Sequence, residues 1–192
     1  EICRQIPSIQ QRVIVPIIDI DTDVPDSQRY ADFLLTENTP PLEFEQLPFD
    51  HPLYIVYSSG TTGVPKCIVH GAGGTLLQQL KEHRLHVDLR SDDVLFYFTT
   101  CGWMMWNWLV AGLGSEATLV LYDGAPFFPN SSAMMDMIDA EQISVFGTSA
   151  KYIDGLQKSG ATPGNSHKLD HLRLILSTGS PLSHEGFSLC LP

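Results

Sequence analysis

Clustered positive charge and long apolar runs are both missing from this sequence of 192 residues. Eleven lysines and arginines are outnumbered by 22 aspartates and glutamates, which gives a formal net charge of −11. A nucleic-acid surface needs clustered Lys and Arg to neutralise phosphates, so we expect no nucleic-acid partner. No apolar run reaches about eighteen residues and the first residues do not form a signal peptide. We therefore expect no membrane partner and a cytoplasmic location.

Paired cysteines and metal-ligand spacings are also missing. The four cysteines, at positions 3, 67, 101 and 190, form no C-x-x-C pair and no Cys/His pattern. We expect free thiols in a reducing compartment and no metal site. His70, His83 and His86 have no accompanying carboxylate or cysteine constellation, so we interpret them as solvated or structural.

What is present is an ordinary globular composition, with 43% hydrophobic and 17% charged residues. Short apolar runs alternate with segments of helical periodicity, which predicts an α/β fold: a mostly parallel sheet flanked by helices. Leu76, Leu77, Leu80 and Leu85 lie near one face of the first long helix. The expected strands are Leu53–Tyr57, Val94–Phe98, Ala117–Tyr122, Ile143–Gly147 and Leu172–Leu176. The expected helices are Gly73–Val87, Ala133–Gln142 and Lys151–Lys158. Near the N-terminus we expect a strand within Val13–Ile18 and a short helix at Tyr30–Leu35.

The segment Tyr57–Cys67 carries the strongest functional signal. Leu53–Tyr57 is expected to be a buried strand, and it leads into a loop of small polar residues with one lysine, Lys66. Glycine lets backbone N–H groups converge on an anion, hydroxyls add adaptable donors, and lysine adds a mobile positive charge. These residues predict phosphate binding; the alternative is an ordinary polar surface loop. The donors are Ser58, Ser59, Gly60, Thr61, Thr62, Gly63 and Lys66.

This loop differs from the common nucleotide-binding loop. No Gly-Lys-Ser/Thr follows Gly60 at the required spacing, and Pro65 stands where that loop would begin its helix. The pattern therefore points away from GTPases and ordinary ATPases.

Tyr57–Cys67 resembles the phosphate loop of the adenylate-forming superfamily, which includes acyl-CoA synthetases, luciferases and peptide-synthetase adenylation domains. The superfamily usually has Gly where Cys67 stands. That departure, together with Ile68–Leu76, is similar to the acetoacetyl-CoA synthetases, and the resemblance runs from about Pro41 to Phe187. It implies that residues 1–192 are a central piece of the AMP-binding domain, the large N-terminal domain of such enzymes. The small C-terminal domain with its catalytic lysine is expected to be absent.

The resemblance also implies a two-step reaction. A carboxylate attacks the α-phosphorus of ATP to give an acyl-adenylate and pyrophosphate, and the CoA thiol then displaces AMP. Ser58, Ser59, Thr61, Thr62 and the amides of Gly60 and Gly63 are expected to bind the β- and γ-phosphates. Lys66 is expected to be the catalytic residue that stabilises the departing pyrophosphate. The ligands of Mg²⁺ are expected to lie mostly outside this segment, which leads us to expect no activity from the segment alone.

Two further segments are assigned by the same resemblance. Gly102, Trp103, Met104 and Met105 correspond to the acyl pocket, although a buried helix face is the ordinary explanation of such a Trp/Met cluster. Thr178, Gly179, Ser180 and Pro181 correspond to the segment that borders the adenine and the acyl group. Relatives often have Glu at the position of Ser180, and they usually have Gly at that of Glu116.

The expected substrates are acetoacetate, ATP and CoA, and no protein partner is implied. Three alternatives stay open: another short-chain acyl-CoA synthetase such as acetyl-CoA synthetase, a non-catalytic nucleotide-binding segment, and an unrelated scaffold protein. The unrelated scaffold would leave the hydroxyl-rich loop unexplained.

Overall fold

The structure is a computed structural model, and it describes residues 2–17, 24–34, 37, 39–58 and 63–190. The chain divides into two compact units, Glu1–Gln46 and Leu47–Pro192. The first unit contains a short 3-10 helix (Ile2–Gln5) and helix α1 (Tyr30–Phe33). Its two short strands, β1 (Val13–Ile14) and β2 (Gln28–Arg29), pair in parallel. The predicted strand and helix of this region are therefore present, although both are shorter than expected.

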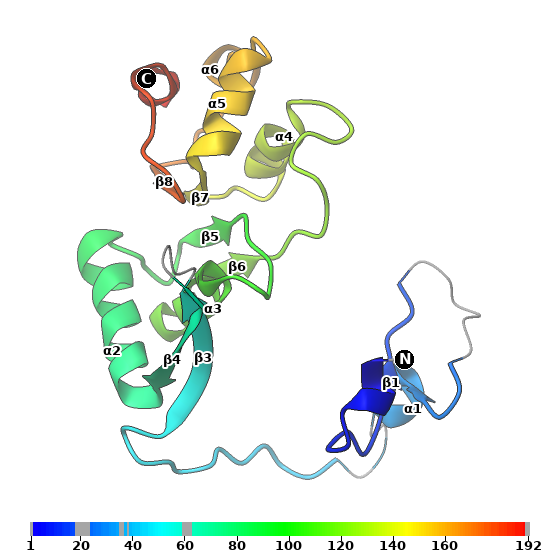
Figure 1. Cartoon of the computed structure of the whole chain (residues 1–192). Helices are drawn as coiled ribbons and strands as arrows, with labels where there is room; N and C mark the ends of the chain where they lie inside the picture. Colours follow the sequence, from blue (N-terminus) through cyan, green and yellow to red (C-terminus); the bar gives the residue numbers. More distant parts are fainter. Residues whose placement is uncertain (1, 18–23, 35–36, 38, 59–62, 191–192) are drawn as a thin grey trace. The chain divides into compact units, whose positions relative to one another are not determined.

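The second unit is built on a parallel sheet of four strands in the order β6-β5-β7-β8 (Figure 1). The strands are β5 (Val94–Tyr97), β6 (Thr118–Val120), β7 (Val145–Ser149) and β8 (Leu174–Thr178). The helices between them are α3 (Met104–Ala111), α4 (Ala133–Ala140), α5 (Ala150–Lys158) and α6 (Pro163–Ser166), and α7 (His184–Leu189) follows β8. This arrangement confirms the predicted α/β fold with a mostly parallel sheet flanked by helices.

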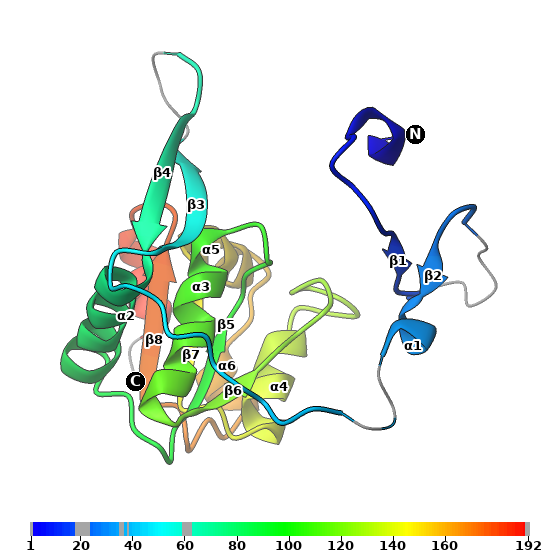
Figure 2. The same ribbon diagram turned by 90° about the horizontal axis from the view of Figure 1, so that it is seen from below.

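Helices cover both faces of this sheet, because alternate strand residues point to opposite sides. Phe96 and Phe146 face α4 and α5 in one hydrophobic cluster. Leu95, Tyr97 and Val145 face α3 in a second cluster. Figure 2 shows α3 in front of the sheet and α5 behind it. The chain therefore changes face between β6 and β7, since that connection returns past β5 to its other side.

An ion pair and a hydrogen bond connect the starts of β5, β7 and β8 at the amino-terminal edge of the sheet. Asp93, Ser144 and Arg173 each come directly before a strand. The Arg173 guanidinium donates through Nε to Asp93 Oδ1 at 2.9 Å, and the Ser144 hydroxyl donates to the same oxygen at 2.6 Å. Arg173 also donates to the carbonyls of Val87 and Asp88, which ties the end of the α2 region to β8.

The hairpin made by β3 (Pro52–Ser58) and β4 (Lys66–Gly71) corrects one expectation. Leu53–Tyr57 is a strand, as predicted, but it is not buried: the exposed fraction of Tyr57 is 68%, and Leu53 and Ile55 are also exposed. The physical reason is that β3 pairs only with β4 among the described residues, in an antiparallel ribbon outside the four-stranded sheet. The hairpin projects beyond that sheet in Figure 2.

Helix α2 (Ala72–Lys81) continues into a π-helical turn, Glu82–His86, as the predicted helix does, but the expected apolar face is wrong. The buried residues are Thr75, Gln79 and His83, spaced four apart on one face. Leu76 and Leu77 are instead exposed, the latter by 61%. Among these polar residues, His83 packs against Trp108 of α3, with the ring centroids 4.2 Å apart.

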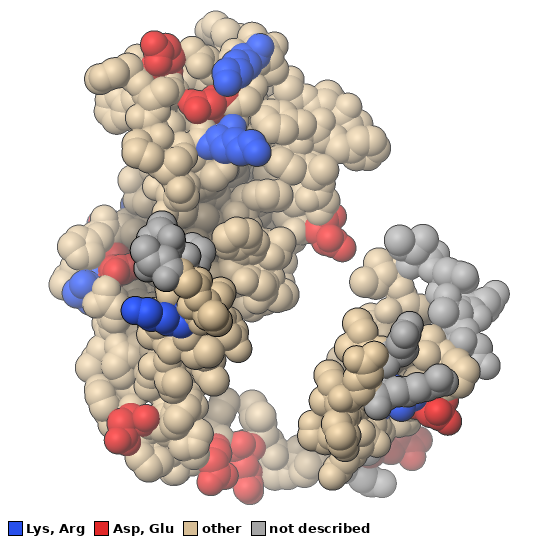
Figure 3. Space-filling view, in the orientation of Figure 1, with Lys and Arg blue, Asp and Glu red and all other residues tan. Residues whose placement is uncertain are grey.

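The surface of the second unit carries no continuous basic patch on the face shown in Figure 3, where the lysines and arginines of the described residues stand apart from one another. Among these described helices, none is both long enough and apolar enough to cross a membrane.

Candidate functional site

The carboxyl-terminal edge of the parallel sheet is where the fold assembles its candidate site. Tyr97, Gly147 and Leu176 are register partners across β5, β7 and β8. The strand β5 ends at this level, and β7 and β8 both continue for two more residues, to Ser149 and Thr178. Open α/β sheets bind ligands at this edge, between adjacent strands whose following helices lie on opposite faces of the sheet. In this chain that position lies between β5 and β7.

The segment after β5 runs from Phe98 into α3. Trp103 precedes the first helical residue in extended conformation and is 70% exposed. Met104 is exposed, whereas Met105 packs against the core cluster that contains Tyr97 and Trp108. A Cβ at Gly102 would meet only the Thr100 hydroxyl, at 3.8 Å. Of the predicted pocket residues, Trp103 and Met104 are thus exposed, whereas Met105 contributes to the core.

The segment after β8 lies at the same edge. Thr178 pairs with Ser149 at the end of β7. Gly179 follows with a φ of +94°, in the region that side chains other than glycine rarely adopt. Thr178, Gly179, Ser180 and Pro181 are all exposed. The fold therefore brings the two predicted substrate segments to one edge of the sheet, although they are about 75 residues apart in sequence.

The ends of the predicted phosphate loop are placed by the hairpin. Ser58 and Lys66 are register partners at its tip, with Ser58 half-buried and Lys66 exposed. Gly63 has open space around its Cα, since a Cβ there would meet no atom within 4 Å. Among the described residues the Lys66 ammonium has no hydrogen-bond or ion-pair partner. The remaining predicted donors, Ser59, Gly60, Thr61 and Thr62, lie outside the described residues.

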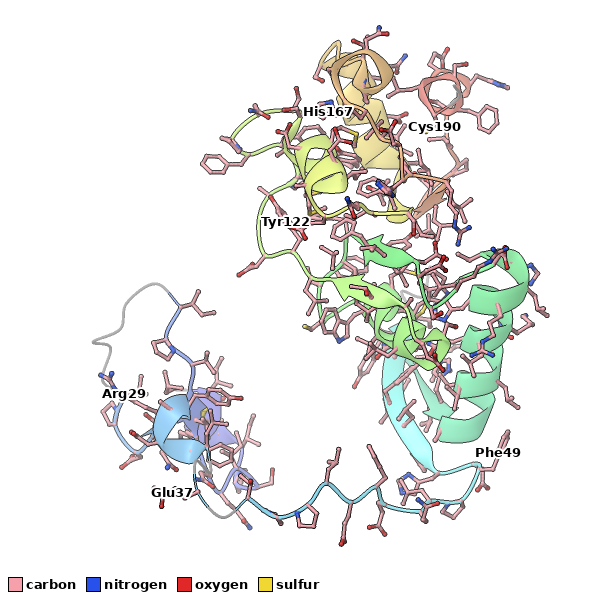
Figure 4. All side chains as sticks on the ribbon, turned by 180° about the vertical axis from the view of Figure 1, so that it is seen from behind. Arg29, Glu37, Phe49, Tyr122, His167 and Cys190 are labelled. Carbon is pink, nitrogen blue, oxygen red and sulfur yellow. The ribbon has the colours of Figure 1, made fainter. Side chains whose placement is uncertain are left out.

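Two cavities adjoin the segment after β5. A hollow of about 340 Å³ lies at the ends of β5 and β6 and is lined by Thr99, Cys101, Trp106 and Tyr122. The loop that carries Tyr122 is labelled in Figure 4. A second cavity of about 420 Å³ lies among the hairpin, α2 and α3. It is the one that Met104 lines, together with Trp108 and the polar face of α2.

His83 is a feature of this region that the sequence did not reveal. Its exposed fraction is 0%, and its ring packs edge-on against Trp108 with the ring centroids 4.2 Å apart. Neither ring nitrogen forms a hydrogen bond of normal geometry among the described residues. Burial lowers the pKa of His83, and the nearby Trp108 backbone and Glu82 only partly oppose this shift. His83 is thus structural, one of the two interpretations made from the sequence, and it is fully buried without a hydrogen bond from the described residues to either ring nitrogen. The i, i+4 spacing of Thr75, Gln79 and His83 was the available signal.

Replacing His83 by Leu should leave the free energy of unfolding at neutral pH unchanged or slightly increased, because no hydrogen bond is lost. The folded-state pKa is below the ordinary value of 6.5, so the wild type loses stability as the pH falls below about 6.5. The Leu variant should lack that part of the loss. Urea denaturation at several pH values measures both effects, with His86→Leu on the same turn as an exposed control. Parallel pH profiles for the wild type and His83→Leu would contradict this assignment.

A metal site is not formed by the described side chains. No group of three His, Cys, Asp or Glu residues among them could hold a metal ion. The nearest approach to such a cluster joins His167 to Asp136 through a 2.9 Å contact at Nε2, and Ser166 to Nδ1 at 2.7 Å. Figure 4 labels His167, whose partner Asp136 belongs to α4.

The geometry defines an α/β domain of the doubly wound type, with candidate ligand loops at the carboxyl-terminal edge of its parallel sheet. A model of the family described as AMP-binding enzyme matches residues 1–188, and the chain belongs to this family of enzymes. This result confirms the predicted superfamily.

Individual relatives show which members of this family the chain resembles. An acetoacetyl-coenzyme A synthetase of Rhizobium meliloti is 65% identical over 158 residues, which cover 82% of this chain and 24% of that protein. An acetoacetyl-CoA synthetase of Gallus gallus is 47% identical over 194 residues, or 97% of this chain and 29% of that protein. The solved structure of acetoacetyl-CoA synthetase from Streptomyces lividans superimposes with a TM-score of 0.86 at 40% identity, over 97% of this chain and 28% of that one. The chain thus spans between 24% and 29% of the length of these relatives. The predicted resemblance to acetoacetyl-CoA synthetases is confirmed.

Proposed function

We propose that this chain is part of an ATP-dependent ligase that joins acetoacetate to CoA, in the cytosol, through an acetoacetyl-adenylate. The observation that carries this proposal is the 65% identity over 158 residues to the Rhizobium meliloti relative, whose name states that product. ATP and CoA are the co-substrates, and the products are acetoacetyl-CoA, AMP and pyrophosphate. The 192 residues contribute part of the AMP-binding domain.

The phosphate loop supplies positive charge and donors in this proposal. Lys66 is exposed at the tip of the hairpin and is held opposite Ser58 by the β3–β4 register. Negative charge accumulates on phosphate oxygens as pyrophosphate departs, so a cation and donors positioned beforehand stabilise the transition state. Ser58, Ser59, Thr61 and Thr62 hold the β- and γ-phosphates with the amides of Gly60 and Gly63.

The carboxyl-terminal edge of the sheet supplies the substrate contacts. Gly179, Ser180 and Pro181 border the base with backbone atoms. Gly102, Trp103, Met104, Met105 and Thr178 line the acyl group. Magnesium neutralises polyphosphate charge in reactions of this class, but the described side chains do not form a set of ligands for it.

A chimera tests the proposal. The matched stretch of the Rhizobium meliloti relative is replaced by the corresponding residues of this chain, and pyrophosphate release is followed with ATP, Mg²⁺, CoA and either acetoacetate or acetate. We expect turnover with a preference for acetoacetate. A folded chimera that prefers acetate would favour another short-chain ligase. One that binds ATP without turnover would favour a non-catalytic nucleotide-binding segment.

The 192-residue chain by itself should release no pyrophosphate in the same assay. In the family that the sequence resembles, a Glu helps to bind Mg²⁺, an Asp holds the ribose and a Lys drives adenylation, and we expect all three to lie outside these residues. Acetoacetate-dependent release under saturating ATP, Mg²⁺ and CoA would contradict this expectation; the chimera, at equal concentration, is the positive control.

A further inference from the structure

The 420 Å³ cavity among the hairpin, α2 and α3 has an unusual combination of linings. Met104, Val69 and Trp108 form an apolar part, and Tyr54, Thr75 and Gln79 add polar groups from β3 and α2. Its volume lies within the range of about 300–1,000 Å³ typical of small-molecule sites. A few fixed polar groups in an apolar cavity usually orient a ligand and determine which ligand is accepted.

Gln79 is the group in this cavity with unused hydrogen-bonding capacity. It is only 8% exposed, yet its single hydrogen bond among the described residues is a long one, 3.3 Å from Nε2 to the Tyr54 hydroxyl. Its amide carries a second N–H and a carbonyl oxygen that have no partner within the described part of the chain. Among the described residues, the enclosed side-chain atoms without a partner do not include those of Gln79. Its free N–H and carbonyl oxygen are therefore open to the cavity and can pair with a polar ligand atom there.

Two other polar side chains of the cavity are already in contact with the protein: His70 packs against Tyr54 with the ring centroids 5.1 Å apart, and Glu82 accepts two hydrogen bonds. Glu82 accepts from Gln78 Nε2 at 2.6 Å and from Trp108 Nε1 at 3.0 Å. Its negative charge remains in the wall of the cavity and repels a second carboxylate. A ligand with a carboxylate at one end and a neutral acceptor at the other would therefore place the neutral end inward, toward Gln79 and Tyr54.

Resting on the proposed function, we infer that Gln79 and Tyr54 determine specificity for the 3-oxo group of the acyl substrate. The 3-oxo acid enters past Met104, which is exposed at the start of α3. Its ketone oxygen accepts hydrogen bonds from the free N–H of Gln79 and from the Tyr54 hydroxyl, while its carboxylate stays on the side away from Glu82. Neither residue contacts the reacting carboxylate, so both act on substrate choice.

The test compares two acids that differ only in the ketone. Butyrate has the carbon skeleton of acetoacetate without the 3-oxo group, so it reports on folding and chemistry while lacking the proposed contact. In the chimera described above, Gln79→Leu should lower the ratio of kcat/KM for acetoacetate to that for butyrate by at least about tenfold. Tyr54→Phe should lower the same ratio in the same direction. Gln157→Leu, the same change at an exposed position of α5, should leave the ratio unchanged.

The possible results separate this inference from the proposed function. Equal ratios in the wild type and both cavity variants, with acetoacetate still accepted, would overturn the inference alone. If the unmodified chimera is folded and refuses acetoacetate, the proposed function fails instead. If Gln79→Leu does not fold, which the loss of butyrate turnover would report, Tyr54→Phe decides the question by the same ratio.

Discussion

Replacing Lys66 by Ala in the chimera should reduce acetoacetate-dependent pyrophosphate release by roughly 10²–10³-fold. The expected loss is large because the ammonium acts on charge that develops only as the pyrophosphate leaves. Lys66 is exposed at the tip of the hairpin, so its removal should not change the folded state. Steady-state kinetics should show the effect mainly in kcat.

Lys158→Ala is the matched control for this prediction. Lys158 is also exposed, but it ends α5, and that helix runs away from the carboxyl-terminal edge of the sheet where it begins. Its replacement should change the rate less than twofold. On the isolated chain, titration with ATP should show weaker binding for Lys66→Ala than for the wild type. Wild-type turnover by the Lys66→Ala variant would contradict the proposed role of this loop in pyrophosphate release.

Replacing Asp93 by Asn should lower the free energy of unfolding by about 2 kcal/mol, the largest stability effect that we predict. The Asp93 side chain is only 7% exposed, and the change leaves the Arg173 guanidinium without its counter-charge. Burial alone would raise the pKa of Asp93, but hydrogen bonds from Arg173, Ser144 and the Arg90 amide outweigh it and lower this pKa to about 2. Urea denaturation at neutral pH measures the difference.

The same pair gives the wild type a defined acid sensitivity. Because the folded-state pKa lies below the ordinary value of 3.8, the carboxylate contributes about 2 kcal/mol of stability above pH 4, and this contribution is lost as the pH falls toward 2. Asp93→Asn should lack that loss. Asp92→Asn changes the exposed neighbouring carboxylate and should behave like the wild type. If both variants unfold at the wild-type urea concentration, the ion pair contributes nothing.

The sheet could be predicted from sequence because its signals are local. Each of the strands β5 to β8 is a short apolar run between segments of helical periodicity, and each predicted strand overlaps the observed one. The phosphate loop could be recognised for the same reason, since its family pattern lies within eleven consecutive residues. What these runs cannot specify is strand order, and the position of β5 between β6 and β7 is what defines the candidate edge.

The failures concern burial, which depends on distant neighbours. The run Leu53–Tyr57 has the same apolar character as β5, yet it is exposed because its only described partner is β4. The leucines of α2 look like a core face, yet the helix buries Thr75, Gln79 and His83 against α3. The sequence did not identify these residues as site candidates, because polar residues on a helix are normally expected to face solvent.

Glu116 shows how a departure from the family pattern can still satisfy the fold. Its φ is +64°, in the left-handed region that glycine adopts without strain, which accounts for the glycine that the family resemblance led us to expect at this position. The turn before β6 is therefore kept in spite of the substitution.

The Asp93–Arg173 pair has a consequence for protein engineering. It joins the strands where they begin, whereas the loops that carry the proposed chemistry leave the strands where they finish. The ion pair that stabilises the sheet and the loops proposed to contact the substrate thus lie at opposite edges of the sheet. Libraries that randomise positions 99–105 and 178–181 should consequently yield folded proteins with altered acyl preference far more often than libraries aimed at positions 93, 144 and 173.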